Sequence, residues 1–146
     1  MNLKIKNALV SVSDKENIGS LLKVLKKHNI KIISSGGTYK SIKKLGYACT
    51  ELSKYTGFKE MLDGRVKSLH PKVHAGILHD RQNKNHKKQM SEQKFPPIDL
   101  IIVNFYPFQR VVMETKNSKD IVDNIDIGGP TMVRAAAKNF KNVTII

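Results

Sequence analysis

Cysteine is nearly absent from the sequence, which has one residue of this type, Cys49, among 146. One cysteine cannot form a disulfide within the chain or build a cysteine-based metal cluster, so we expect Cys49 to be a small buried apolar residue in a reducing compartment. Long apolar runs are also missing: none approaches the roughly 18 residues of a membrane span, and residues 1–6 lack a signal-peptide apolar segment. The sequence therefore predicts a soluble, cytoplasmic protein with no membrane partner.

Acidic residues are scarce, with 12 Asp and Glu against 26 Lys and Arg, which gives a formal net charge of +14. Such a charge suits nucleic acid, a membrane surface or anionic small molecules. The lysines are spread over expected helix faces and loops, without an arginine-rich or aromatic-interleaved block. A general lysine bias explains this charge more simply than a nucleic-acid surface, so we expect no specific nucleic-acid partner.

Internal repeats, low-complexity tracts and linkers are absent, and residues 1–146 are expected to form one domain. Four short apolar runs have the character of strands: residues 7–12, 31–35, 47–52 and 98–103. Strands that alternate with helices predict an α/β fold with a mostly parallel sheet and right-handed crossovers. Because the chain stops inside a further apolar run at 143–146, we expect this domain to lack its C-terminal end.

Helical patterns lie between these runs. The first, which ends at Asn29, is expected to be capped by Ser13 or Asp14. Further helices are expected over residues 39–45 and 131–139, and residues 80–94 are expected to form a mobile loop or an exposed helix. The glycines at 36–37 are expected to make a turn before their helix.

Polar residues follow the expected strands, and ligands bind parallel α/β sheets at the carboxyl ends of the strands. Ser11, Ser13 and Lys15 follow the first strand, and Asn104 and Tyr106 follow the strand at 98–103. The segment Ser35, Gly36, Gly37 and Thr38 follows the second strand. Its glycines let backbone N–H groups approach an anion at a helix N-terminus, so it is a candidate phosphate site, although an ordinary glycine turn is the alternative. It matches neither the Walker loop nor the dinucleotide fingerprint.

A basic stretch over residues 62–78 is the strongest candidate site. Arg65 and Lys67 lie two residues apart behind Gly64, and Pro71 prevents a helix from including them. Two cations on one side suit a ligand with several anionic or carbonyl oxygens, whereas a solvated basic loop is the alternative. Further along, Gly128 and the glycine after it could form a second anion-accepting turn. Lys138 follows three alanines and is a candidate for proton transfer, or a lysine that simply extends to solvent.

Five segments together resemble the N-terminal inosine-monophosphate cyclohydrolase domain of the bifunctional purine-biosynthesis enzyme that also carries aminoimidazole-carboxamide-ribotide (AICAR) transformylase. They are residues 11–15, 35–38, 64–78, 104–108 and 126–139, in the same order as in that family. The resemblance covers nearly all of the chain. Small departures are Ser68, where the family often has Thr, and Phe105, where Leu is common. The resemblance also implies that the transformylase domain is absent from this chain.

This resemblance implies a three-layer, methylglyoxal-synthase-like (Rossmann-like) fold, a homodimer, and no metal or organic cofactor. It implies a purine-nucleotide substrate, 5-formamidoimidazole-4-carboxamide ribotide (FAICAR), which closes its six-membered ring with loss of water to give inosine monophosphate (IMP). The catalytic set that it implies is Lys67, Tyr106, Asp126 and Lys138. The nucleotide and phosphate set is Ser13, Lys15, Ser35, Gly37, Thr38, Arg65 and Ser68, to which position in the sequence adds Ser11, Gly36, Asn104 and Gly128.

Three other interpretations remain. The chain could be a non-catalytic purine-nucleotide-binding or regulatory module of the same fold. It could be a methylglyoxal synthase, which His70 and His74 would suit, although the Arg-Val-Lys and Ala-Ala-Ala-Lys segments argue against it. A metal site on the two histidines is disfavoured, because Pro71 disrupts the helical spacing and no carboxylate pattern lies nearby.

Overall fold

The centre of the sheet is β1 (Asn7–Ser11), whose apolar residues are buried on both faces. The computed structural model describes residues 4–146, and its five strands follow the order β3-β2-β1-β4-β5 with every neighbouring pair parallel. The other strands are β2 (Lys31–Ser34), β3 (Thr50–Glu51), β4 (Leu100–Val103) and β5 (Thr144–Ile145). The predicted α/β class with a parallel sheet is confirmed. Residues 1–3, part of the segment expected to lack a signal peptide, lie outside the described residues.

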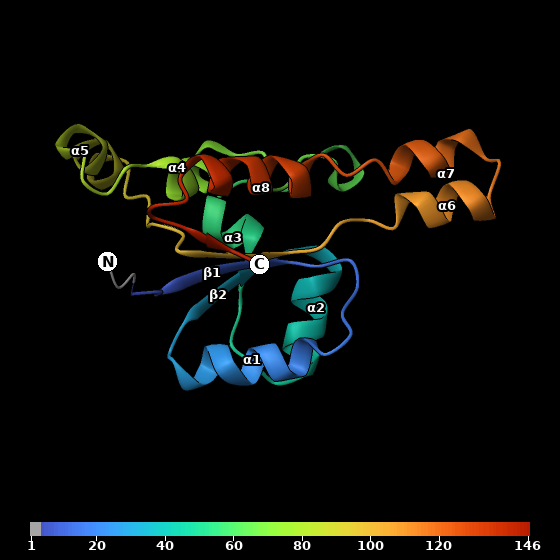
Figure 1. The fold of residues 1–146 in the computed structure, drawn as a ribbon, viewed down its shortest axis with the longest axis horizontal. Coiled ribbons are helices and arrows are strands. Elements are labelled where there is room, and N and C mark those ends of the chain that lie inside the picture. The colour runs from blue at the N-terminus through green and yellow to red at the C-terminus, as the bar shows by residue number, and fades with distance from the viewer. Residues whose placement is uncertain (1–3) are drawn as a thin grey trace.

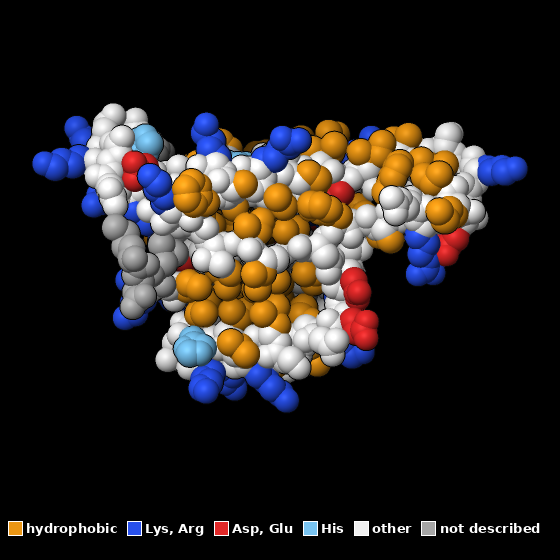
Figure 2. Space-filling view, viewed as in Figure 1, with side chains coloured by type: hydrophobic (Ala, Val, Ile, Leu, Met, Phe, Trp, Pro, Cys, Tyr) orange, Lys and Arg blue, Asp and Glu red, His pale blue; other side chains and the backbone are white. Residues whose placement is uncertain are grey.

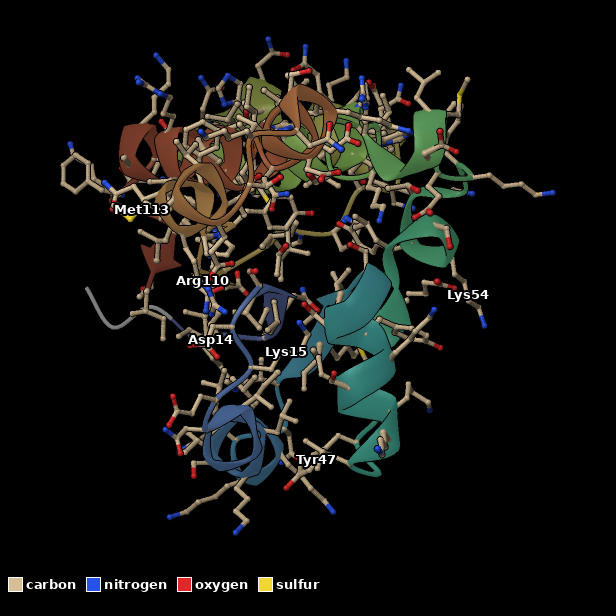
Figure 3. The ribbon with its side chains drawn as sticks, turned by 90° about the vertical axis from the view of Figure 1, so that its right-hand side faces the viewer. Asp14, Lys15, Tyr47, Lys54, Arg110 and Met113 are labelled. Carbon is tan, nitrogen blue, oxygen red and sulfur yellow. The ribbon has the colours of Figure 1, made fainter. Side chains whose placement is uncertain are left out.

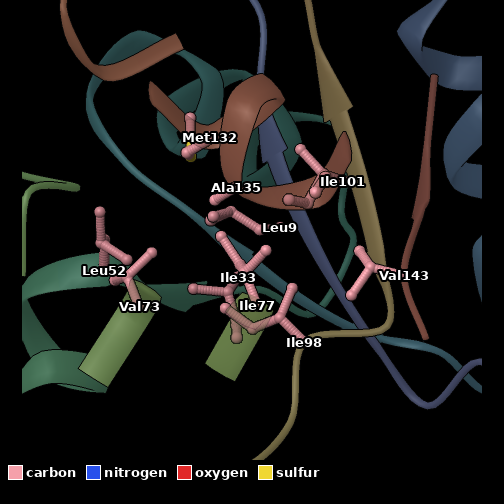
Figure 4. Packing of buried hydrophobic residues seen from close by; sticks show 11 residues of the cluster. Leu9, Ile33, Leu52, Val73, Ile77, Ile98, Ile101, Met132, Ala135 and Val143 are labelled. Carbon is pink, nitrogen blue, oxygen red and sulfur yellow. The ribbon is translucent and has the colours of Figure 1, made fainter. Parts of the chain in front are cut away.

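Helices cover both faces of the sheet and produce three layers (Figure 1). One face carries α1 (Ile18–Lys27) and α2 (Gly36–Lys44), and the other carries α3 (Leu52–Thr56), α4 (Pro71–Leu78) and α8 (Gly128–Lys138). Successive side chains of a strand point to opposite faces. Leu9 therefore joins the core cluster against α4 and α8 (Figure 4), while Ala8 and Val10 join the cluster against α1 and α2. Two covered faces explain the uninterrupted apolar run of this strand.

A pair of short helices extends from one end of the molecule, α6 (Phe108–Glu114) and α7 (Ser118–Asp123) (Figure 1). Neither helix has a buried residue, and Val112, Met113 and Val122 are exposed by 46%, 86% and 52%. Hydrophobic side chains gather on this end of the molecule (Figure 2). We call residues 108–123 the α6–α7 arm. None of the helices within residues 4–146 is long and apolar enough to cross a membrane.

A buried polar network ties the opposite, amino edge of the sheet together. The carboxylate of Asp99, 2% exposed, accepts hydrogen bonds from the backbone N–H groups of Lys6 (2.7 Å) and Asn7 (2.8 Å), and pairs with Arg81 (2.8 Å). The Asn139 side chain donates to the carbonyl oxygen of Ile77 (2.7 Å) and so joins α8 to α4. Buried polar groups of this kind need their partners, because an unpaired one costs about 1–3 kcal/mol.

Two helices begin earlier than predicted. Helix α2 begins at Gly36 rather than after a glycine turn, because Gly36 adopts φ +54° and turns the chain directly from β2 into the helix. Helix α8 begins at Gly128 rather than at residue 131, with its proline in the first turn, where the absent N–H is tolerated. Both glycine pairs therefore belong to helix N-termini.

Other local predictions are partly wrong. The cap of α1 is neither Ser13 nor Asp14, since the helix begins after Asn17, a left-handed residue (φ 59°) without a side-chain cap. The third strand contains only Thr50–Glu51 of the expected residues 47–52, because it is an edge strand that pairs with β2 at two positions. Residues 84–92 form α5 (Lys84–Glu92), a helix without buried residues, so the exposed-helix alternative for the lysine-rich segment is confirmed.

Candidate functional site

The carboxyl edge of β1 and β4 is the point where the connections of the sheet diverge. The chain leaves β1 for α1 on one face, and the crossover from β4 to β5 ends with α8 on the other face (Figure 1). In open parallel sheets such a switch point leaves a crevice outside the strand ends, where ligands bind. Figure 3 faces this edge and shows Lys15 near its middle.

Asn104, which follows β4, joins the two diverging loops. Its Oδ1 accepts hydrogen bonds from the backbone N–H groups of Ser13 (2.6 Å) and Asp14 (3.1 Å), and its Nδ2 donates to the carbonyl oxygen of Asp14 (2.9 Å). The side chain thus holds the loop that carries Lys15 against the end of the neighbouring strand. Ser11 is the last residue of β1 beneath this loop.

The N-terminus of α2 is flanked by two ammonium groups. A Cβ atom built on Gly37 would lie 3.8 Å from Lys15 Nζ, and one built on Gly36 would lie 3.4 Å from Lys67 Nζ. The Lys15 ammonium also donates to the carbonyl oxygen of Ser13 (2.8 Å). Ser35, the N-cap residue, makes no capping hydrogen bond through its side chain, and the first turn holds no acidic residue. The positive end of a helix dipole and two cations converge here, which is the arrangement that binds an anion.

Thr38, in the first turn of α2, has a structural contact that the sequence did not predict. Its hydroxyl donates to the carbonyl oxygen of Val12 (2.8 Å) and accepts from the Val12 N–H (3.1 Å), and its side chain is buried. The only hydroxyl proton is therefore already used, and Thr38 positions the loop after β1 relative to α2.

Lys67 and Arg65 lie on the loop before α4 and point to different partners. Lys67 pairs with Glu60 (3.3 Å), and its side chain passes over Gly64, where φ is +87° and no Cβ intervenes. Arg65 instead pairs with Asp123 at the end of α7 (2.5 Å). The expectation that both cations point the same way is therefore wrong, because each meets a different carboxylate.

The start of α8 brings three separate segments together. Asp126 Oδ1 accepts the N–H of Gly129 (2.8 Å) and so caps the helix. A Cβ on Gly128 would lie 2.5 Å from the Ser68 hydroxyl oxygen, and one on Gly129 would lie 2.9 Å from the Phe105 ring. The Ser68 loop, the end of β4 and Asp126 thus meet at these glycines, which admit no side chain. The Asp126 carboxylate already accepts the Gly129 N–H, which leaves one fewer backbone donor open at the anion-accepting turn expected at Gly128.

Tyr106 follows the end of β4, whereas Lys138 lies at the C-terminal end of α8. Tyr106 follows Phe105 in the connection from β4 to α6 and is half exposed. Lys138 is an exposed residue at the last turn of α8, so the helix separates it from Gly128 by about 15 Å at 1.5 Å per residue. Asp126 and Lys138, two members of the expected catalytic set, therefore lie at opposite ends of α8 within one chain.

The two histidines of the basic stretch, His70 and His74, belong to the local structure of α4. His70 Nδ1 accepts the N–H of Lys72 (3.1 Å) and caps α4, with Pro71 as the first helical residue. Burial lowers the pKa of His74 below its ordinary 6.5, and a backbone contact with Ser68 opposes this shift. Within the described part of the chain, no three His, Cys, Asp or Glu side chains gather as a metal site requires.

Cys49 packs half buried against the core cluster of α1 and α2. Burial raises the pKa of its thiol to about 11, with Glu51 adding to the rise and Lys43 opposing it. The raised pKa disfavours the reactive thiolate form of Cys49 at pH 7.

Sequence reasoning missed the two acidic partners, Glu60 and Asp123. Glu60 lines a hollow of about 310 Å³ beside the α2 N-terminus, together with Ser35, Phe58 and Lys67. Neither residue belongs to a recognisable sequence motif, because each contributes to the site only through its ion pair with a basic residue. Only an antiparallel bridge between Met61 and Val66, invisible in the sequence pattern, brings Glu60 to Lys67.

The fold and the site define a class: a parallel three-layer α/β protein in which two lysines flank a helix N-terminus at the carboxyl edge of the sheet. Residues 17–131 match the model of the MGS-like domain family, and the chain belongs to that family. It is 50% identical over 145 residues to the "Bifunctional purine biosynthesis protein PurH" of Leptospira biflexa and 52% identical over 141 residues to that of Clostridium perfringens. These alignments cover 99% and 97% of this chain but 28% of each relative.

A solved structure shows the same fold. The chain described as "Crystal structure of ForH" superposes with a TM-score of 0.82 at 30% identity, covering 97% of this chain and 74% of that one. The expected methylglyoxal-synthase-like architecture is therefore confirmed. The present chain spans 28% of the length of the curated relatives that it matches.

Proposed function

We propose that the chain is an IMP cyclohydrolase, which closes the pyrimidine ring of FAICAR with loss of water. The observation that carries the proposal is the convergence of Lys15 and Lys67 on the uncapped N-terminus of α2, at the carboxyl edge of the sheet. The helix N-terminus with Lys15 suits a ribotide phosphate. Lys67, which lies over Gly64 beside that site, is assigned to a second oxygen of the same ligand. The relatives named as bifunctional purine biosynthesis proteins support the substrate class.

Positioning is the main task in this reaction. The carboxamide nitrogen is a poor nucleophile, but nucleophile and formyl carbon belong to one molecule, so alignment supplies much of the acceleration. With the phosphate at α2, the heterocycle extends toward Ser68, Asp126 and Tyr106. Lys67 stabilises the formyl oxygen, which leaves as water, and Asp126 orients the carboxamide through the carboxylate oxygen that does not cap α8.

Proton transfer is assigned to Tyr106 and Lys138. Lys138 can reach the site only from a second copy, because α8 holds it at the opposite end within one chain. A homodimer is therefore part of the proposal, and the exposed apolar residues of the α6–α7 arm support it. The proposal also includes a cytoplasmic location and, as the resemblance implies, no cofactor.

The test is the ultraviolet-absorbance assay for IMP formation from FAICAR with the full chain. Lys67→Ala should lower kcat by about 10²–10³-fold, the usual cost of removing a group that stabilises a developing oxyanion, with a smaller effect on KM. Lys87→Ala, on the exposed helix α5, is the control and should keep near-normal turnover. Normal turnover of Lys67→Ala would remove this lysine from the mechanism.

A non-catalytic nucleotide-binding module is the second candidate, and the placement of Lys138 at the opposite end of α8 from Asp126 is the observation that favours it. Binding of IMP by calorimetry, without turnover of FAICAR, would support this reading. Methylglyoxal formation from dihydroxyacetone phosphate is the corresponding assay for a methylglyoxal synthase, and we expect none.

A further inference from the structure

Lys67 is in contact with three groups, two from its own loop and one from the start of α2. Its Cε and Nζ atoms lie 2.5 and 2.7 Å from the position of a Cβ on Gly64, so the side chain lies flat on that glycine. Nζ then reaches Gly36 at the start of α2 and meets the Glu60 carboxylate at 3.3 Å. The lysine side chain is 29% exposed, although a lysine with a flexible four-carbon stem ordinarily extends into water.

The electrostatics of this position are unfavourable without a counter-charge. The ammonium stands at the positive end of the α2 dipole and on the same helix N-terminus as Lys15. Lys15 is held by the carbonyl oxygen of Ser13, whereas the Glu60 carboxylate is the partner shown for Lys67 among residues 4–146. Glu60 therefore offsets the repulsion that would otherwise move Lys67 away from the helix.

The local backbone brings Glu60 and Lys67 next to each other. Met61 and Val66 form an antiparallel bridge, and Glu60 and Lys67 are the next residues outward, which makes them a cross-strand pair. The turn between them contains Leu62, Asp63 and Gly64, all with positive φ (53°, 53° and 87°). Leucine rarely adopts this conformation, although aspartate tolerates it better, and such strain is concentrated at functional sites.

We propose that Glu60 is a positioning residue, whose carboxylate holds the Lys67 ammonium at the N-terminus of α2 in the orientation that the ring closure requires. This inference rests on the proposed function. Glu60 does not touch the reacting atoms, and it acts through Lys67 alone. The hollow that Glu60 lines also contains Glu51, which provides a matched carboxylate without an ion pair to Lys67.

The first test needs no substrate. Acetylation of Lys67 by acetic anhydride in the ligand-free full chain is followed by peptide mass spectrometry in wild type, Glu60→Gln and Glu51→Gln. Both variants lose one negative charge beside the same hollow. Release from a partly exposed ion pair should raise the Lys67 rate about two- to fivefold in Glu60→Gln and leave it unchanged in Glu51→Gln. Equal rates in the two variants would overturn the proposal.

The second test separates positioning from general stability. Glu60→Gln should lower kcat for FAICAR about tenfold with KM within about threefold, and Glu60→Asp should recover part of the loss, at unchanged melting temperature. Wild-type kcat in Glu60→Gln would overturn the proposal.

A wild-type chain without turnover would refute the proposed function, and IMP affinity would then decide the role of Glu60. Weaker IMP binding by Glu60→Gln than by Glu51→Gln would support positioning. Equal or tighter binding would overturn it, because Glu60 would then be idle or would compete with the ligand for Lys67.

Discussion

Replacing Asn104 by alanine tests whether the loop after β1 depends on this side chain. Asn104→Ala removes the three hydrogen bonds to Ser13 and Asp14. A hydrogen bond contributes about 0.5–1.5 kcal/mol net to the free energy of unfolding. We use the lower end of this range, because water can replace Asn104 at the exposed backbone groups of Ser13 and Asp14. We therefore expect the free energy of unfolding to fall by about 1.5 kcal/mol in urea titrations. The melting temperature should fall by about 3–6 °C, given about 2–4 °C per kcal/mol for a chain of this size.

The same substitution should weaken IMP binding, because the loop that carries Lys15 loses its attachment. Asn117→Ala is the control: Asn117 also accepts a backbone N–H, from Lys119 at 3.0 Å, but it caps α7 and lies outside the site. It should cost about 1 kcal/mol of stability and leave the Kd unchanged. An Asn104→Ala chain with wild-type stability and wild-type Kd would refute the reasoning, and so would an equal loss of affinity in both variants.

Three further predictions concern stability, assembly and pH. Asp99→Ala should lower the free energy of unfolding by about 3–5 kcal/mol in urea titrations, because it leaves the partly buried Arg81 guanidinium without a carboxylate and two N–H groups without an acceptor; a loss below about 1 kcal/mol would contradict this. Mixing inactive Lys67→Ala and Lys138→Ala chains should restore part of the FAICAR turnover if the two lysines act from different copies, and no restoration would mean that they do not. Burial lowers the folded-state pKa of His74 and His79, so the unfolded state binds more protons below about pH 6.5, and the melting temperature should fall as pH drops from 7 toward 5; asparagine at both positions should flatten this dependence.

The sheet could be predicted because its signal is local and strong. Three of the predicted apolar runs contain β1, β2 and β4, since both faces of a central parallel strand are buried and leave little choice of residue. The length of the third strand was overestimated, because Tyr47 and Cys49 do not pair with β2. Their side chains pack against a core cluster, which explains the apolar pattern at these positions. An apolar run alone does not distinguish these roles.

The site could be predicted only as far as sequence position determines it. The carboxyl-edge rule brought Lys15, Gly37 and Asn104 to one edge, because that placement follows from strand direction. Strand direction does not predict which of these side chains already make hydrogen bonds within the protein. The hydroxyl of Thr38 and the amide of Asn104 are occupied by the loop after β1, and these contacts depend on atomic distances that no spacing rule contains.

Two glycine pairs looked equivalent in the sequence, and the structure gives them different roles. At α8 the helix N-terminus has its own anion, Asp126, which accepts the Gly129 N–H at 2.8 Å. At α2 no acidic residue enters the first turn, Ser35 makes no cap, and two lysines approach instead. A helix start that gathers cations against its own dipole is a local conflict, and such conflicts are kept where a ligand resolves them. Under the proposed function this asymmetry fixes the direction of the nucleotide: the phosphate binds at α2, and the ring closes toward α8.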